Sequence, residues 1–163
     1  MSYLVRGYLE EDELPPKPSK ERLEKRAVAY IECPQEIPCS PCIESCDYGA
    51  IKMENINAPP PEVDYEKCNG CMKCIRICPG LAIFMLRLKN GKGYVTLAYE
   101  FLPWPKKGQE VILLNRKGEE VGKGKVTWVL PPEKNDKTSL VRVEMDPDLI
   151  FDVRAIRIVG KGE

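Results

Sequence analysis

The residues most able to do chemistry are eight cysteines, which form two runs in a chain of 163 residues. The second run has the spacing C-x2-C-x2-C-x3-C and is followed by Pro79, and the first run has a first gap that is three residues longer. The first run consists of Cys33, Cys39, Cys42 and Cys46, and the second of Cys68, Cys71, Cys74 and Cys78. At this spacing three thiolates of a run hold one 4Fe-4S cluster, and the fourth reaches a second cluster. Both runs therefore predict iron–sulfur chemistry.

The two runs are copies of one pattern. Three matches support the duplication: Val28-x-Tyr30-x-x-Cys33 with Val63-x-Tyr65-x-x-Cys68, Cys42-Ile43 with Cys74-Ile75, and Ala50-Ile51 with Ala82-Ile83. The match around Cys33 indicates that this residue is a ligand in spite of the longer gap that follows it. Since there are two copies, we expect one pseudo-symmetric domain rather than a solenoid.

The spacing also predicts how the thiolates divide between two clusters. A tight loop can wrap three irons of a cube, and the fourth iron faces away and needs a thiolate from elsewhere. We assign Cys33, Cys39, Cys42 and Cys78 to cluster one, and Cys68, Cys71, Cys74 and Cys46 to cluster two. Because the fourth ligands cross between the halves, we expect cluster binding and folding to be coupled.

Two other uses of the cysteines are possible in principle. An even number of cysteines is compatible with disulfides, but cysteines two residues apart on tight loops bridge poorly, and there is no secretory signal. Two CxxC pairs could together hold one zinc ion, which needs four ligands. That site would leave the third and fourth cysteines of each run without a role. The spacing favours iron–sulfur clusters over both.

From about Ala27 to Leu88 the chain resembles a bacterial-type ferredoxin with two 4Fe-4S clusters. The resemblance implies an α+β fold in which short hairpins and two small helices surround the clusters. The chain departs from the family in the longer gap, which contains Pro34 and Pro38, and in Asp47, which stands where proline usually follows the fourth cysteine. The first departure leaves open a 3Fe-4S cluster at the first site, if Cys33 is out of reach.

Composition excludes several functions. The chain has no histidine, which removes Rieske ligation, histidine-ligated haem and histidine general bases. The 25 basic and 25 acidic side chains balance, so no strongly basic stripe suggests nucleic-acid binding. No apolar run is long enough to span a bilayer. Eight thiols without a secretory signal favour a reducing, cytoplasmic location.

The remaining sequence predicts two further parts around the ferredoxin-like domain of residues 27–102, which ends in a hairpin turned at Asn90-Gly91. Residues 1–26 form an apolar tip and a proline-rich tether, interpreted as partner-docking or flexible, before a helix capped by Ser19. Residues 103–163 alternate as short strands, 109–115, 120–130, 139–145 and 155–159, which we expect to close into a small antiparallel β-barrel used for docking. The expected fold class is therefore α+β.

The whole arrangement is similar to the small iron–sulfur subunits of multi-subunit FAD-dependent dehydrogenases of amino acids or glycerol 3-phosphate. The resemblance implies a non-catalytic subunit in a hetero-oligomer, which passes single electrons from a flavoprotein partner through two 4Fe-4S clusters to an external acceptor. The alternative is a free-standing ferredoxin carrier. A carrier has no use for the tail and the barrel, so the sequence favours the subunit.

Overall fold

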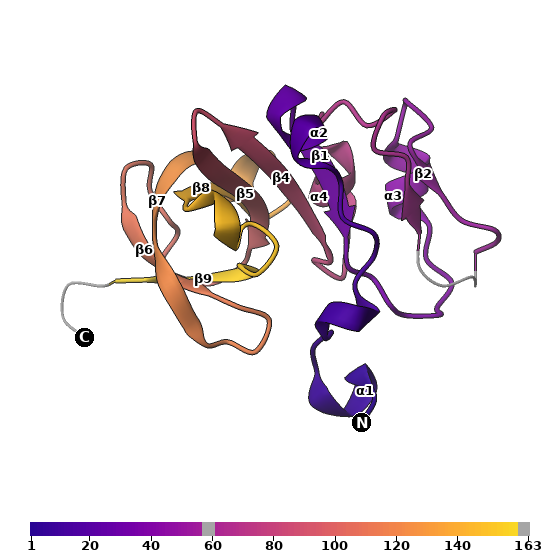
Figure 1. Ribbon diagram of the computed structural model, residues 1–163, viewed down its shortest axis with the longest axis horizontal. Coiled ribbons are helices and arrows are strands. Elements are labelled where there is room, and N and C mark those ends of the chain that lie inside the picture. The colour runs from indigo at the N-terminus through magenta and orange to yellow at the C-terminus, as the bar shows by residue number, and fades with distance from the viewer. Residues whose placement is uncertain (57–60, 160–163) are drawn as a thin grey trace.

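The computed structural model describes residues 1–56 and 61–159, and its main element there is one antiparallel sheet (Figure 1). The strands are β1 (Val28–Ile31), β4 (Ile83–Lys89), β5 (Lys92–Tyr99), β6 (Glu110–Leu114), β7 (Glu120–Leu130), β8 (Ser139–Met145) and β9 (Ala155–Ile158). Their order across the sheet is β1-β4-β5-β8-β7-β6-β9. The strands expected after residue 82 are thus confirmed, with ends that differ by a few residues.

One row of residues shows why this sheet forms the core. Val28, Leu86, Val95, Val143 and Val126 lie opposite one another on β1, β4, β5, β8 and β7. All five side chains are fully buried. Because β-branched and aliphatic side chains pack well on a pleated surface, the row joins five strands through apolar contacts.

The sheet runs without a break through the position where the second domain was expected to begin. Strand β5 pairs with β8 along its length, from Gly93 opposite Met145 to Tyr99 opposite Ser139. Main-chain hydrogen bonds therefore connect residues on both sides of 102/103. The division into 1–26, 27–102 and 103–163 stays a prediction, as does closure of the barrel, since β1 and β9 lie at opposite ends of the strand order.

The hairpin between β4 and β5 follows from its turn residues. Asn90 and Gly91 both have positive φ angles, 53° and 74°. A two-residue turn of this kind needs left-handed backbone at both positions, which Asn and Gly tolerate best. The expected Asn-Gly hairpin is confirmed.

Cys42 and Cys74 lie in two short helices, and the other cysteines lie in loops around a group of short elements beside the sheet, on the right in Figure 1. These elements are α3 (Pro41–Ser45), α4 (Lys73–Ile77) and a small sheet of β2 (Ile51–Lys52) with β3 (Glu62–Val63). Helices α3 and α4 contact each other, and α4 also contacts β4. The helices thus bring the two cysteine runs together against the sheet.

The first 26 residues contain α1 (Tyr3–Arg6), a 3₁₀ turn (Glu11–Glu13) and α2 (Lys20–Lys25). The Ser19 hydroxyl accepts a hydrogen bond from the Arg22 amide at 3.2 Å, so the expected N-cap is confirmed. The Tyr30 hydroxyl donates to the Pro15 carbonyl at 2.7 Å, and the Tyr65 hydroxyl donates to that of Pro16. The tether therefore contacts the rest of the chain.

Two short 3₁₀ turns complete the fold, at Pro132–Lys134 and Pro147–Leu149. Among the helices of the described ranges, none has the length and apolar character that crossing a bilayer requires.

Candidate metal centre

Two small cavities are each lined by four cysteines. One is lined by Cys33, Cys39, Cys42 and Cys78, which we call the first cysteine group. The other is lined by Cys46, Cys68, Cys71 and Cys74, the second cysteine group. Each cavity thus receives three cysteines from one run and one from the other. The groups have the membership assigned above from spacing, and their role as cluster ligands stays a prediction.

The first cysteine group is held by α3, α4 and the loop before β4. Pro41 begins α3, a position that suits proline because its missing amide has no partner in the first turn. The Ser45 hydroxyl donates to the Cys42 carbonyl at 2.9 Å at the end of this helix. The Ala82 amide donates to the sulfur of Cys78 at 3.4 Å. An amide aimed at a sulfur stabilises negative charge there, as a thiolate ligand requires.

The second cysteine group contains the two buried cysteines, Cys68 and Cys74, which are 9% and 7% exposed, and also the exposed Cys71. The Ala29 amide of β1 donates to the sulfur of Cys68 at 3.4 Å. Gly70 has a φ of 77°, and a Cβ there would lie 2.7 Å from the Ala27 carbonyl oxygen. A glycine is therefore needed for the loop to approach β1 so closely.

The spacing of the sulfurs does not match a site for a single zinc ion. All eight cysteines lie in the described residues and are free thiols. No three of their sulfurs come within 4.8 Å of one another. Thiolates on one tetrahedral zinc ion would lie about 3.8 Å apart, given Zn–S bonds of about 2.3 Å. No three cysteine sulfurs of the described residues therefore have the spacing of a tetrahedral zinc site.

Burial makes the thiols of Cys74 and Cys42 poor anions without a metal. Burial, together with the neighbouring thiol groups, raises the pKa of Cys74 to about 12 and that of Cys42 to about 11. The low-dielectric surroundings disfavour a bare thiolate, whereas a bound cationic metal centre stabilises it. Both cavities thus offer soft sulfur donors, and a metal that binds there must displace protons that burial holds on the thiols.

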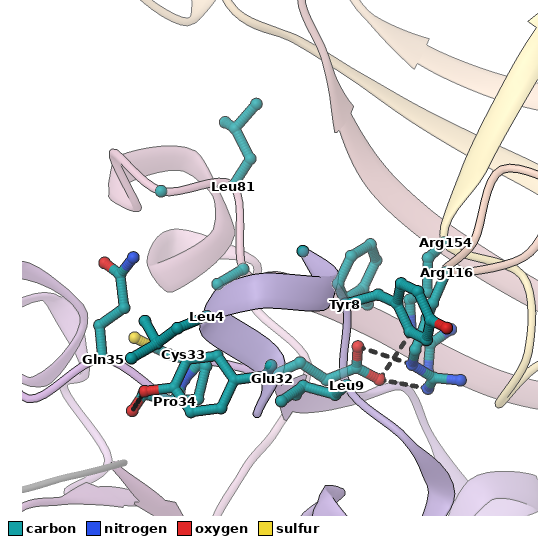
Figure 2. Close-up of a pocket in the computed structure, with 15 residues that line it drawn as sticks. Leu4, Tyr8, Leu9, Glu32, Cys33, Pro34, Gln35, Leu81, Arg116 and Arg154 are labelled. Atoms are coloured by element: carbon teal, nitrogen blue, oxygen red, sulfur yellow. Dashed lines mark hydrogen bonds and ion pairs between the residues drawn. The ribbon is translucent and has the colours of Figure 1, made fainter. Parts of the chain in front are cut away.

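A buried ion-pair network lies beside the first cysteine group and was not predicted from the sequence. Glu32, next to Cys33, pairs with Arg116 and with Arg154, and the side chains are 8%, 12% and 5% exposed. Arg154 also lies over the ring of Phe84, at 4.7 Å from its centroid. The network joins the end of β1 to the turn after β6 and to the residue before β9 (Figure 2).

Next to this network lies a more open cavity of about 490 Å³. Figure 2 shows its lining, with Tyr8 beside Arg116 and Leu4 near Gln35 and Cys33. The wall on one side comes from the N-terminal segment, in which Leu4 is 74% exposed. The first cysteine group is therefore approached from outside along an apolar and aromatic surface.

Comparison with known proteins agrees with this chemistry. A 4Fe-4S binding domain model matches residues 60–83, which include the whole second run. Pyruvate synthase subunit PorD of Methanothermobacter marburgensis is 37% identical over 60 residues, which cover 37% of this chain and 67% of that protein. The chain belongs to the ferredoxin-type 4Fe-4S proteins. It is an electron-transfer iron–sulfur protein.

Two other relatives match a similar share of this ferredoxin-type chain. A subunit of the ion-translocating oxidoreductase complex of Methanosarcina acetivorans is 40% identical over 58 residues, which cover 36% of this chain. The ferredoxin-type protein NapF of Haemophilus influenzae is 36% identical over 58 residues, covering 34% of it. The chain spans 20% and 33% of these two proteins. No solved structure matches the chain.

Proposed function

We propose that the chain is an electron-transfer subunit of a larger oxidoreductase complex and that it binds two 4Fe-4S clusters. Cluster one is held by the first cysteine group and cluster two by the second. The observation that carries the proposal is the pair of cavities, each lined by three cysteines of one run and one of the other. This exchange of the fourth cysteine is the arrangement that two-cluster ferredoxins use.

The residues of the chain would do three things for electron transfer. A 4Fe-4S cluster supplies uptake and release of one electron at a time. The thiolates hold it in place, and the amides of Ala29 and Ala82 stabilise the sulfurs of Cys68 and Cys78. The apolar surroundings of Cys68 and Cys74 keep water away from these two thiols of the second cysteine group. Burial and hydrogen bonds of this kind set the reduction potential.

As the partner we propose an FAD-dependent flavoprotein dehydrogenase that delivers electrons, with a separate external acceptor. Two relatives are named as subunits, of an ion-translocating oxidoreductase complex and of pyruvate synthase, which supports a multi-subunit setting. The N-terminal tip also supports it, because Met1, Leu4 and Val5 are at least 70% exposed. Apolar side chains that cluster at a surface are typical of protein interfaces. A cytoplasmic location stays a prediction.

Anaerobic purification of the native protein, followed by metal and flavin analysis, tests this proposal. We expect about eight irons and eight labile sulfides per chain, no stoichiometric zinc, and co-purifying flavoprotein chains. Stoichiometric zinc in fresh protein would contradict the cluster assignment. Elution as a monomer that exchanges electrons freely would favour a ferredoxin carrier instead.

The role of the tip can be tested separately. The double variant Leu4→Asp/Val5→Asp should retain both clusters, because no ligand lies there, but should weaken assembly with the partner. The matched control is Val159→Asp, which changes a side chain that is 56% exposed at the end of β9. If the tip variant assembled with the partner as well as the wild type does, the tip would not be part of the interface.

A further inference from the structure

Arg22 of α2 is a buried cation without a carboxylate partner. The residue is 4% exposed, and no ion pair of the described residues includes it. The guanidinium donates to three main-chain carbonyls, those of Tyr65, Cys68 and Arg26. Five donors in a rigid fork suit such a site, which a lysine could not fill in the same way.

Arg26 contacts the same loop from the end of the helix. Its Nε donates to the Cys68 carbonyl at 3.1 Å, and its Nη2 donates to the Glu66 carbonyl at 3.0 Å. The Cys68 carbonyl therefore accepts from two guanidinium groups, while the Cys68 sulfur accepts from the Ala29 amide. Residues 22–29 thus fix the first cysteine of the second run through both its main chain and its side chain.

The charges around the two cysteine groups differ in consequence. Beside Cys33, the cations Arg116 and Arg154 share the carboxylate of Glu32. Near the second cysteine group, the exposed Lys67 and Lys73 pair with Asp64 and Asp47. Arg22 has carbonyl partners instead; it forms no direct ion pair, and the carboxylate of Glu66 acts on it only through longer-range electrostatics.

We propose that Arg22, assisted by Arg26, is a positioning residue for cluster two: it holds the Cys68 loop in its binding geometry and raises the reduction potential of that cluster. The inference rests on the proposed two-cluster function. Reduction adds negative charge, which a buried cation stabilises, and burial weakens the screening by water. Arg26 is less buried, so its effect should be smaller.

The test compares Arg22→Gln, Arg22→Lys and the control Lys25→Gln in the anaerobically reconstituted full chain. Lys25 is an exposed cation of the same helix. Reduction potentials are measured by EPR-monitored titration, and the signal that changes in Cys71→Ser identifies cluster two. We expect Arg22→Gln to lower the potential of cluster two alone. Arg22→Lys should keep most of the potential but lose cluster two to an iron chelator several-fold faster. Lys25→Gln should match the wild type.

Several results would overturn the inference. The first is an unchanged reduction potential of cluster two in Arg22→Gln. The second is a shift of equal size in the potentials of both clusters, and the third is an equal shift of the cluster-two potential in Lys25→Gln. If Arg22→Gln does not fold, Arg22→Lys and Arg26→Gln are used for the test instead. The inference would then be contradicted if both variants had the wild-type potential of cluster two and lost that cluster to the chelator at the wild-type rate.

Iron content separates this failure from that of the proposed function. About eight irons with an unshifted potential overturns the inference alone. About four irons per chain would overturn the two-cluster function. If Cys71→Ser also left the remaining EPR signal unchanged, that signal would not come from cluster two, and the inference about Arg22 would be overturned as well.

Discussion

The first and second cysteine groups each contain four thiols from related sequences, yet their surroundings differ. The second group includes the buried Cys68 and Cys74 and the exposed Cys71, and it is held by α2 and β1. The first group is only partly buried throughout and adjoins the open cavity of about 490 Å³. The duplication therefore repeats the ligands but not the environment, and environment sets potential and access. We expect partners to reach cluster one through the open cavity and cluster two through the exposed Cys71.

The largest effect is expected when the cysteine that one run contributes to the other group is replaced. Cys78→Ser should damage the cluster of the first group, although Cys78 belongs to the second run, and Cys46→Ser should damage the cluster of the second group. Each variant loses one of four thiolate ligands, so we expect loss of up to about four irons. Iron analysis and EPR spectra measure it. If Cys78→Ser changed only the signal of the cluster held by Cys68, Cys71 and Cys74, the assignment would be wrong.

Replacing Glu32 by alanine should have the second-largest effect, a loss of stability. Arg154 and Arg116 would remain buried without their carboxylate, which typically costs about 3–5 kcal/mol of stability. The loss should appear in denaturant unfolding of the cluster-loaded protein. Glu120→Ala, which breaks the exposed pair with Arg157, should change stability little. Equal effects of the two variants would contradict a structural role for the buried network.

A smaller effect is expected at Gly70, on the side of the second group. In Gly70→Ala the new Cβ would meet the Ala27 carbonyl oxygen at 2.7 Å, in a backbone conformation unfavourable for alanine. We expect a cost of about 1–3 kcal/mol and weaker retention of cluster two. Thermal unfolding and chelation kinetics measure both. Gly80→Ala is the control, because a Cβ there meets no atom within 4 Å.

The smallest effect concerns the cap of α2. Ser19→Ala removes the acceptor for the Arg22 amide and should cost about 1 kcal/mol. Since α2 carries Arg22, we expect the second group to be affected more than the first. Ser19→Thr should retain most of the stability. Thermal unfolding of both variants measures this loss of stability. Identical melting temperatures for Ser19→Ala and the wild type would contradict a stabilising role for the cap.

Local patterns in the sequence predicted the strands after residue 82, the hairpin, the start of α2 and the candidate ligands. Alternating apolar residues marked β4 to β9, Asn90-Gly91 marked the hairpin, and Ser19 marked the start of α2. Cysteine spacing also predicted the two groups that the structure brings around separate cavities. These features depend on short stretches of chain, which explains why a single sequence reveals them.

The residues that support the site could not be found in this way. Arg22 meets Cys68 across 46 positions, and Arg154 meets Glu32 across 122. Both arginines stand in charged or mixed stretches, where a sequence pattern suggests exposed side chains. Similarly, the pairing of β5 with β8 crosses a proline-containing segment that suggested a domain boundary. Only the folded chain shows these long-range contacts.

The ladder between β5 and β8 has a consequence for any fragment of this protein. A piece ending near residue 102 would leave β5 with a row of unpaired amides and carbonyls from Gly93 to Tyr99. An uncovered strand edge of this kind recruits other strands, including those of identical copies. Such a fragment should self-associate or aggregate even if its cysteines still bind iron, so it is a poor substitute for the full chain.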